Sequence, residues 1–367
     1  MSAANDVPVL DYRPQFPERR LGVAILGCGQ IATTAHLPAY QRYGVDVVGV
    51  WSRDEATTAD IHERFPGVGT VYRDGAALLA DPRVAIVDIA TGPSGRIGWI
   101  VAAIAAGKHV LAQKPLISDP AELPELLAVI AEARRRGLRI AVNQNARWAP
   151  AWRLATLLIR DGAIGEVVGV THLHDKPLPP IAGTPFDALE HMLLSDYLVH
   201  WVDITRCWLE GATIQTVSAH DSRVPGQPDS ARNPWQATAH IGCTNGATAS
   251  LRVVGNAATR TGGCPFWVHG TEGTLRGSIL LGSDRLVLER GDASTSFALD
   301  GQWFVDGFAG TMAELMSAID EDREPENSAA HVVASVRTTF AAVESARADG
   351  AVVRPVDLRL TPARGDR

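Results

Sequence analysis

Hydrophobic and polar positions follow two different patterns along the chain, and the change comes near residue 145. Before it, short apolar runs of strand length alternate with helical patterns. The runs are 21–26, 45–51, 84–90, 109–112 and 138–142, and the helical patterns are 56–64, 97–106 and 121–136. Strands joined by helical crossovers predict a parallel, doubly wound sheet, which binds its ligands at the carboxyl ends of the strands.

After residue 145 a linking helix at 150–161 leads into strand-type runs without crossover helices. The runs are 167–174, 214–220, 236–242, 247–254, 266–269, 274–281 and 286–289, and helical patterns stand at 193–209, 306–320 and 329–348. Hairpin signals such as Thr244-Asn245-Gly246 separate some of the runs. This pattern predicts an α+β domain with a large, mostly antiparallel open sheet. The proline-rich stretch 177–185 is expected to form a mobile loop over a cleft.

The first apolar run leads into Gly27-Cys28-Gly29-Gln30-Ile31-Ala32, which fits G-x-G-x-x-A between a strand and a helix. Gly27 permits a tight turn, Gly29 leaves room for a pyrophosphate, and Ala32 lets the helix pack closely on the strand. The helix that begins at Gln30 directs its free N–H groups toward the phosphates. The motif predicts a dinucleotide site on a Rossmann sheet.

Three regions follow from these patterns: an N-terminal arm at 1–20, a Rossmann domain at 21–145, and an α+β substrate and oligomerisation domain at 146–367. The cofactor is expected to contact residues at the carboxyl ends of the parallel strands. These residues are Gly27, Gly29, Gln30, Ile31, Ala32, Ser52, Arg53, Thr91, Pro93, Gln113, Lys114 and Asn143.

Composition narrows the class of protein. The chain has 367 residues, of which 46% are hydrophobic and 20% charged, as in ordinary globular proteins. Its net charge of −7 provides no basic surface for nucleic acid. Four scattered cysteines form no C-x-x-C pair, residues 1–20 contain no apolar signal segment, and no apolar run reaches the length of a membrane span. We therefore expect a cytoplasmic protein with no membrane partner and no nucleic-acid partner.

Several separated motifs resemble the Gfo/Idh/MocA oxidoreductases, which include glucose–fructose oxidoreductase and the inositol dehydrogenases. The motifs are the glycine turn, His36-Leu37-Pro38, the stretch from Gly107 to Leu116 that contains Gln113-Lys114-Pro115, Asp196-x-x-x-His200, and Asp306-Gly307-Phe308. The resemblance implies a nicotinamide-dependent enzyme acting on a sugar, polyol or related ring alcohol. It also implies a cis peptide before Pro115 and a homodimer or homotetramer joined through the second domain's sheet.

Three positions depart from the family pattern. Gln113 stands where a glutamate is usual, Arg96 where many members have a histidine, and Ala146 where an arginine often precedes Arg147. The cofactor half of the resemblance survives these changes, whereas the substrate does not follow from them.

The catalytic residues expected are Lys114, Asp196 and His200. Lys114 follows a short apolar strand and should project at the crevice, where it could stabilise a developing alkoxide. Asp196 and His200 are spaced i, i+4, so that on a helix the carboxylate could orient the imidazole for proton transfer. Without the resemblance, a solvated surface lysine and a structural Asp–His pair would be the simpler interpretations. Losing the carboxylate at 113 should lower the pKa of Lys114, which could then share the role of base.

The expected substrate-binding residues are Lys114, Arg147, Trp148, His172, His174, Asp196 and His200. Trp148 lies in the segment that joins the two domains, and its ring suits the C–H face of a sugar. His172 and His174 share one face of a strand. Two such imidazoles could ligate a metal, but nothing fixes further ligands, so we assign no metal and place them on a polar strand face lining the cleft.

Cofactor choice and assembly complete the expectations. Ser52-Arg53 follows the second strand where NAD-selective folds place an acidic residue, so we expect NADP, with NAD still open if Asp54 turns inward. One face of the second sheet must pack on helices, and we expect the other to be too apolar to leave bare.

The sequence thus predicts an NAD(P)-dependent dehydrogenase that transfers hydride between nicotinamide and a CH–OH carbon of a carbohydrate, polyol or inositol-like substrate. Two alternatives stay open. One is a redox-neutral sugar hydrolase or lyase that keeps its dinucleotide tightly bound. The other is a non-catalytic cofactor-sensing regulator, which would have no need of the Lys114, Asp196 and His200 set.

Overall fold

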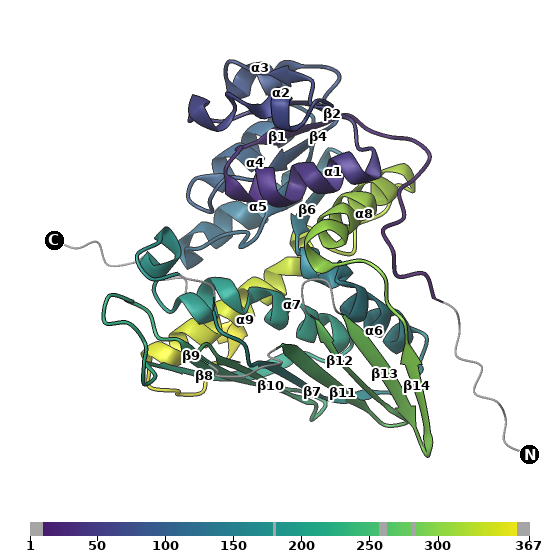
Figure 1. Cartoon of the computed structure of the whole chain (residues 1–367), viewed down its shortest axis with the longest axis vertical. Coiled ribbons are helices and arrows are strands. Elements are labelled where there is room, and N and C mark those ends of the chain that lie inside the picture. The colour runs from purple at the N-terminus through teal and green to yellow at the C-terminus, as the bar shows by residue number, and fades with distance from the viewer. Residues whose placement is uncertain (1–9, 179–180, 257–262, 280–283, 358–367) are drawn as a thin grey trace, which may run out of the picture. The chain divides into compact units, whose positions relative to one another are not determined.

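The computed structural model describes residues 10–178, 181–256, 263–279 and 284–357 (Figure 1). Contacts divide the chain into two compact units, which we treat one at a time. Of the described residues, the six-stranded unit contains 14–145 and 304–336, and the eight-stranded unit contains 10–13, those between 146 and 303, and 337–357. Within the described residues, no helix is both long enough and apolar enough to cross a membrane.

The six-stranded unit is built on a fully parallel sheet with the order β3-β2-β1-β4-β5-β6. The strands are β1 (Val23–Leu26), β2 (Val47–Trp51), β3 (Thr70–Val71), β4 (Ile86–Ile89), β5 (His109–Gln113) and β6 (Ile140–Asn143). The strand order reverses between β1 and β4, which confirms the predicted doubly wound fold. The pattern gave no sign of β3, because two exposed residues are too short to show a period.

Capping side chains and a glycine mark the ends of several helices in this unit. They are α1 (Leu37–Tyr43), α2 (Ile61–Arg64), α3 (Gly75–Ala80), α4 (Arg96–Ala105), α5 (Leu123–Arg135) and α8 (Phe308–Asp320). Asp74 caps α3 by accepting the N–H of Ala77, and Asp119 forms a capping box with Glu122 just before α5. Gly44 ends α1 in the left-handed conformation that glycine adopts without strain.

A late segment of the chain packs into this unit. The side chains of Phe308, Met312 and Leu315 on α8 are buried in the same core as β1 and α1. Asn327 and Val142 are hydrogen-bonded through both backbone and side chain. The expected boundary at 145 had grouped residues 304–336 with the second domain. Local periodicity carries no information on which core a helix joins.

The eight-stranded unit has the sheet order β14-β13-β12-β11-β7-β10-β9-β8. Its strands are β7 (Val167–His174), β8 (Ile214–Ser222), β9 (Gln236–Cys243), β10 (Thr248–Val254), β11 (Cys264–Gly270), β12 (Thr274–Ile279), β13 (Arg285–Arg290) and β14 (Ala293–Phe297). All neighbours are antiparallel except β7 and β10, so the predicted mostly antiparallel sheet is confirmed. The polar edge strand β14 was not predicted.

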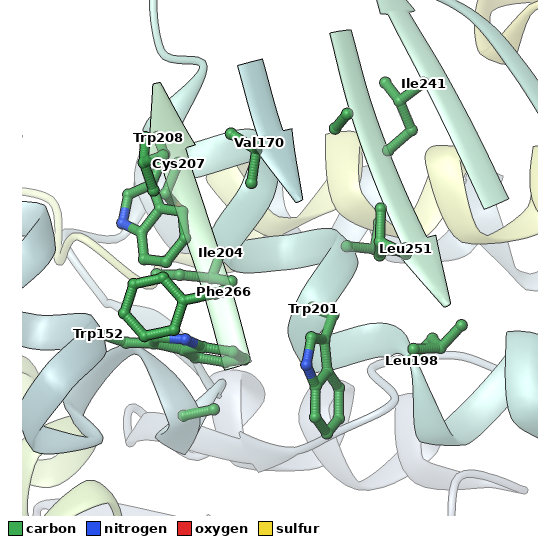
Figure 2. Close-up of a cluster of buried hydrophobic side chains, with 14 of the residues drawn as sticks. Trp152, Val170, Leu198, Trp201, Ile204, Cys207, Trp208, Ile241, Leu251 and Phe266 are labelled. Atoms are coloured by element: carbon green, nitrogen blue, oxygen red, sulfur yellow. The ribbon is translucent and has the colours of Figure 1, made fainter. Parts of the chain in front are cut away.

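One face of this sheet is covered by helices α6 (Pro150–Arg160) and α7 (Val199–Trp208), with the later part of α9 (Ala329–Arg347) also in this unit. The core between them is aromatic, and Figure 2 shows Trp152, Trp208 and Phe266 gathered close together. Large apolar side chains from the helices and from the strands bury this face of the sheet.

The other face of the sheet is mostly polar. A row across it, from β12 through β11, β7, β10 and β9 to β8, reads Arg276, Trp267, Thr171, Ser250, His240 and Ser218. A bulge beside Gly270 keeps Val167 inside and leaves Val168 46% exposed. The expectation of an apolar open face is therefore wrong for the described residues, and burial alone does not require a partner there.

Candidate functional site

The glycine turn of the six-stranded unit is shaped as the motif predicts. Gly27 has a φ of +102°, and a Cβ built on it would lie 3.0 Å from Thr91. Only glycine fits this position without strain. A Cβ built on Gly29 would meet no atom within 4 Å, so the turn has open space at this residue. The backbone can therefore be approached closely by a ligand, as a pyrophosphate site requires.

The helix after this turn begins with a π-helical turn, η1 (Ala32–His36), rather than the regular first turn that we expected. Its last residue, His36, has its Nδ1 atom 2.6 Å from Oδ2 of Asp88 on β4. The Tyr40 hydroxyl donates to the same oxygen over 2.6 Å. All three side chains are buried. The wide turn thus coincides with a buried anchor between the helix and the central strand β4.

Asn143 extends this buried network. Its Nδ2 atom lies 3.3 Å from Nε2 of His36, and its Oδ1 atom accepts a hydrogen bond from the Thr311 hydroxyl over 2.9 Å. Both ends of the amide are therefore used inside the unit. The predicted cofactor contact of Asn143 remains a prediction, and it rests on the position of Asn143 at the carboxyl end of β6.

Polar atoms without partners gather where β4 and β5 end. Thr91 Oγ1 follows β4 and Gln113 Oε1 ends β5, and both are buried with no hydrogen-bond partner in the protein. Such atoms cost free energy unless a ligand or water satisfies them. Half-buried Lys114 comes next, and the Lys114–Pro115 peptide is cis, as the resemblance implies. These residues suit a bound dinucleotide, which supplies both donors and acceptors.

Arg96 holds the same two loops together. Its guanidinium donates from Nη2 to the Thr91 carbonyl and from Nη1 to the Pro115 carbonyl. The residue is 1% exposed and begins α4. The sequence had marked it only as a departure from the family pattern. The sequence did contain a signal for its burial, because Arg96 is a charged residue in the otherwise apolar first turn of α4.

The residues after β2 bear on cofactor choice. Ser52 is half-buried and Arg53 exposed. The Asp54 carboxylate accepts the N–H of Ala56 over 3.1 Å and caps a short 3₁₀ turn. The Asp54 carboxylate therefore has a structural role as a helix cap, independent of any cofactor ribose.

In the eight-stranded unit, Asp196 and His200 do not share the regular helix that the sequence predicted. Asp196 lies in a second π-helical turn, η6 (Leu193–Tyr197), which the N–H of Leu198 closes on the Leu193 carbonyl over 2.8 Å. His200 lies in the first turn of α7. Both side chains are at least nine-tenths buried. Their relative orientation is therefore set by a wide turn, which is frequent at functional sites.

Aromatic residues surround this pair. The ring of His200 meets that of Trp303 edge to face, with centroids 5.4 Å apart. The Tyr197 ring stacks on Trp201 at 5.5 Å. The contact between Trp303 and His200 had no signal in the sequence, because the two residues are about a hundred positions apart.

Arg147 forms a buried ion pair. Its Nε and Nη2 atoms donate to the two carboxylate oxygens of Asp203 over 2.6 and 2.7 Å. Asp203 lies on α7, so the ion pair joins this helix to the segment just before α6. The substrate role of Arg147 remains a prediction, since this pair already uses two of its donors. Neighbouring Trp148 is buried beneath the guanidinium of Arg153, which lies 5.4 Å from its ring centre.

His172 and His174 share one face of β7, as alternation predicts, and within this unit that face is the packed one. His172 lies against Trp152, Trp208 and Phe266 with neither nitrogen hydrogen-bonded, and burial lowers the pKa of His172 to about 3. These surroundings differ from the polar face that we expected. Their substrate role stays a prediction.

His174 has its Nε2 atom 2.6 Å from the Tyr197 hydroxyl, and burial lowers the pKa of His174 to about 4. Within the described part of the chain, no three His, Cys, Asp or Glu residues gather closely enough to hold a metal ion.

The sequence also missed the pairing of His36, Tyr40 and Asp88. A signal was present, because Asp88 is a charged residue inside the apolar run 84–90 and a buried carboxylate needs donors. What the sequence lacked was the identity of those donors.

A six-stranded parallel sheet whose strand order reverses at β1 and β4, with an open glycine turn after β1, defines the class of dinucleotide-binding Rossmann folds. Residues 21–144 match the family model described as the oxidoreductase family with an NAD-binding Rossmann fold, and residues 152–276 match the GFO/IDH/MocA C-terminal domain. Together these matches span more than half of the chain, which belongs to the GFO/IDH/MocA oxidoreductase family.

Individual relatives are more distant. The chain is 29% identical to D-apiose dehydrogenase of Paraburkholderia graminis over 56% of its own length and 54% of that protein, so this match spans about half of the relative. It is 26% identical to inositol 2-dehydrogenase of Acidothermus cellulolyticus over 91% of the chain and 95% of the relative.

Solved structures agree on the fold. An oxidoreductase from Agrobacterium radiobacter in complex with NAD⁺, L-tartaric acid and magnesium superposes with a TM-score of 0.79 and 23% identity, covering 92% of this chain and 99% of that one. An aldose–aldose oxidoreductase from Caulobacter crescentus gives a TM-score of 0.76 at 21% identity over 92% of this chain and 100% of that one.

Proposed function

We propose that the protein is an NADP-dependent dehydrogenase acting on a CH–OH carbon of a sugar or polyol. The main support is the pair of unpartnered polar atoms, Thr91 Oγ1 and Gln113 Oε1, at the strand ends beside Lys114 and the open glycine turn. The names of the relatives, D-apiose dehydrogenase and inositol 2-dehydrogenase, support the substrate class. We assign nucleotide binding to residues 21–145 and substrate binding to the region from 146 onward.

The preference for NADP rests on Arg53 and Asp54. An exposed guanidinium can pair with a 2′-phosphate and stack on adenine. Asp54 accepts a local backbone N–H, so its carboxylate is not held ready for the ribose hydroxyls. Dissociation constants for NADP⁺ and NAD⁺ test this preference, and Arg53→Ala should weaken NADP⁺ more than NAD⁺. Tighter binding of NAD⁺ by the unaltered protein would contradict it.

We assign separate chemical tasks to the three proposed catalytic residues. When bound, the nicotinamide ring exchanges a hydride with the carbinol carbon. As that hydride leaves, the hydroxyl must lose its proton and negative charge develops on oxygen. We assign proton transfer to His200, orientation of His200 to Asp196, and stabilisation of the charge to the Lys114 ammonium.

The test begins with a search for a substrate. Absorbance of the reduced nicotinamide is followed across a panel that includes D-apiose, inositols, hexoses and sugar acids. On a substrate so found, Lys114→Met and His200→Ala should each lower kcat by about a hundredfold or more, the scale of a lost acid–base group. Lys176→Met and His240→Ala remove the same residue types elsewhere and serve as controls.

Two results would contradict the assignment. One is near-normal turnover by both Lys114→Met and His200→Ala. The other is an equal loss in the two control variants, which would indicate a general effect on folding. His200→Ala should leave the cofactor dissociation constant unchanged, because the glycine turn and the strand ends β4 and β5 belong to the six-stranded unit.

We also propose that the chain forms a homodimer or homotetramer through the open face of the eight-stranded sheet. The resemblance to the family supports this, together with half-buried Trp267 and Leu173 on a mostly polar face. Light scattering at micromolar concentration should give a multiple of 39.1 kDa. Trp267→Glu should lower that mass, and a monomeric mass for the unaltered protein would overturn the proposal.

A further inference from the structure

Arg96 is the buried cation at the carboxyl edge of the parallel sheet. Its guanidinium bonds the Thr91 carbonyl, in the loop after β4, and the Pro115 carbonyl, in the loop after β5. Those loops also carry Thr91 Oγ1 and Lys114, and Gln113 Oε1 lies at the end of β5, next to Lys114. One side chain therefore fixes the spacing between the two backbone segments that hold the unpartnered atoms.

The position of these loops indicates which end of a dinucleotide they face. In this fold the pyrophosphate lies at the glycine turn after β1, and the residues after β2 recognise the adenine-side ribose. The order β3-β2-β1-β4-β5-β6 places that half of the cofactor on one side of β1. The other half, with the nicotinamide, is left to the ends of β4 and β5, where Arg96 lies.

Charge adds a second consequence. A guanidinium stays protonated at every working pH. Water and salt ions screen a buried charge less than they screen a surface charge. The nicotinamide ring is positively charged when oxidised and neutral when reduced. A fixed positive charge on this side of the sheet therefore disfavours the oxidised ring and leaves the reduced ring unaffected.

We propose that Arg96 is a positioning residue that holds the loops of Thr91 and Lys114 together and that its charge makes the protein bind reduced cofactor more tightly than oxidised cofactor. The inference rests on the proposed function, and it concerns how tightly the oxidised and reduced forms of the cofactor bind. It assigns a use to one of the positions at which the chain departs from its family.

The chain offers a matched control in Arg136. This residue ends α5 and donates from Nη1 to the carbonyl of Ile104 in α4, so it also joins two segments of the same unit through a backbone oxygen. Helices α4 and α5 end just before β5 and β6 begin, so this contact lies at the opposite edge of the sheet from the strand ends. Arg136→Gln should reproduce any general effect of losing such a contact.

The experiment measures dissociation constants of NADP⁺, NADPH, NAD⁺ and NADH by calorimetry or fluorescence for folded protein, with thermal unfolding recorded in parallel. In Arg96→Gln the ratio of oxidised to reduced dissociation constants should fall roughly threefold to tenfold, the size expected for one charge several ångströms away. Arg96→Met gives a second neutral variant if the first does not fold. Arg96→Lys keeps the charge and should keep the ratio.

Arg136→Gln should change the ratio by less than about twofold, since its charge is remote from the strand ends. An unchanged ratio in folded Arg96→Gln and Arg96→Met, or the same fall in Arg136→Gln, would overturn the assignment while leaving the proposed function standing. Absence of binding of any of the four nucleotides by the unaltered protein would instead overturn the proposed function, and this inference with it.

Discussion

Two buried histidines, His36 in the six-stranded unit and His172 in the eight-stranded unit, have opposite surroundings. In the six-stranded unit His36 lies between the Asp88 carboxylate and the Asn143 amide, and each ring nitrogen has a polar neighbour. In the eight-stranded unit His172 lies among indole and phenyl rings, and neither nitrogen has one. Both residues are almost fully buried, at 0% and 2% exposure.

The difference shows that burial does not fix the chemistry of a histidine. An imidazole with a carboxylate partner keeps a hydrogen-bonded role, and here it joins the helix after the glycine turn to the central strand. An imidazole surrounded by apolar groups is held neutral, because burial disfavours its charged form. Three substitutions, examined in four measurements, test how far this contrast extends, beginning with the largest expected effect.

Asp203→Ala tests whether the eight-stranded unit also depends on a paired buried charge. Removing the carboxylate takes away the charged partner of the buried Arg147 guanidinium, which should lower the free energy of unfolding by about 3–5 kcal/mol. Denaturant unfolding measures the loss. Glu132→Ala removes a partner of the exposed Arg135 and should change the free energy of unfolding far less, because water and salt screen an exposed pair. Equal losses would show that the buried pair carries no special weight.

His36→Phe tests the paired side of the contrast. The ring volume is kept, but the Asp88 carboxylate loses one of two donors and the Asn143 amide loses a partner, so we expect a loss of about 2–3 kcal/mol. The control is His62→Phe, which removes only an exposed contact with the Gly69 carbonyl. Similar stability of the two variants would mean that the buried network contributes little.

The pH dependence of stability tests the unpaired side. The pKa of His172 is lowered from its ordinary value of 6.5 to about 3 in the folded protein, so below about pH 6.5 only the unfolded state binds this proton. Stability is thus retained above 6.5 and lost as the pH falls toward 3, at about 1.4 kcal/mol per pH unit. His172→Phe should reduce the measured slope near pH 5 by that amount. A slope that this substitution does not change would contradict the lowered pKa.

The smallest effect is expected for His172→Phe at about pH 8, where the imidazole is neutral in both states. The substitution removes two unpartnered nitrogens from an aromatic pocket and adds little volume, so the free energy of unfolding should stay within about 1 kcal/mol. Chemical denaturation at this pH measures it. A loss like that of His36→Phe would indicate that His172 has a polar partner in solution.

The sequence by itself determined the classes of local structure and the turn that organises the first unit. Gly27 permits the tight turn, because glycine adopts a positive φ without strain. The alternation of apolar runs with helical patterns determined a parallel sheet. The run 167–174 was predicted with the bounds that the structure has, because its valines and threonine favour extended backbone. The position of Lys114 directly after β5 followed from the short apolar run that precedes it.

The tertiary structure decided which residues meet. That α8 packs in the core of the six-stranded unit, that Asp88 receives His36 and Tyr40, and that Arg96 joins the loops after β4 and β5 are contacts between segments with no shared period. The π-helical turns η1 and η6 were also decided at this level, because a regular helix satisfies the same sequence pattern. Periodicity reports which face of an element is apolar, whereas the partner of a buried polar atom depends on how the whole chain packs.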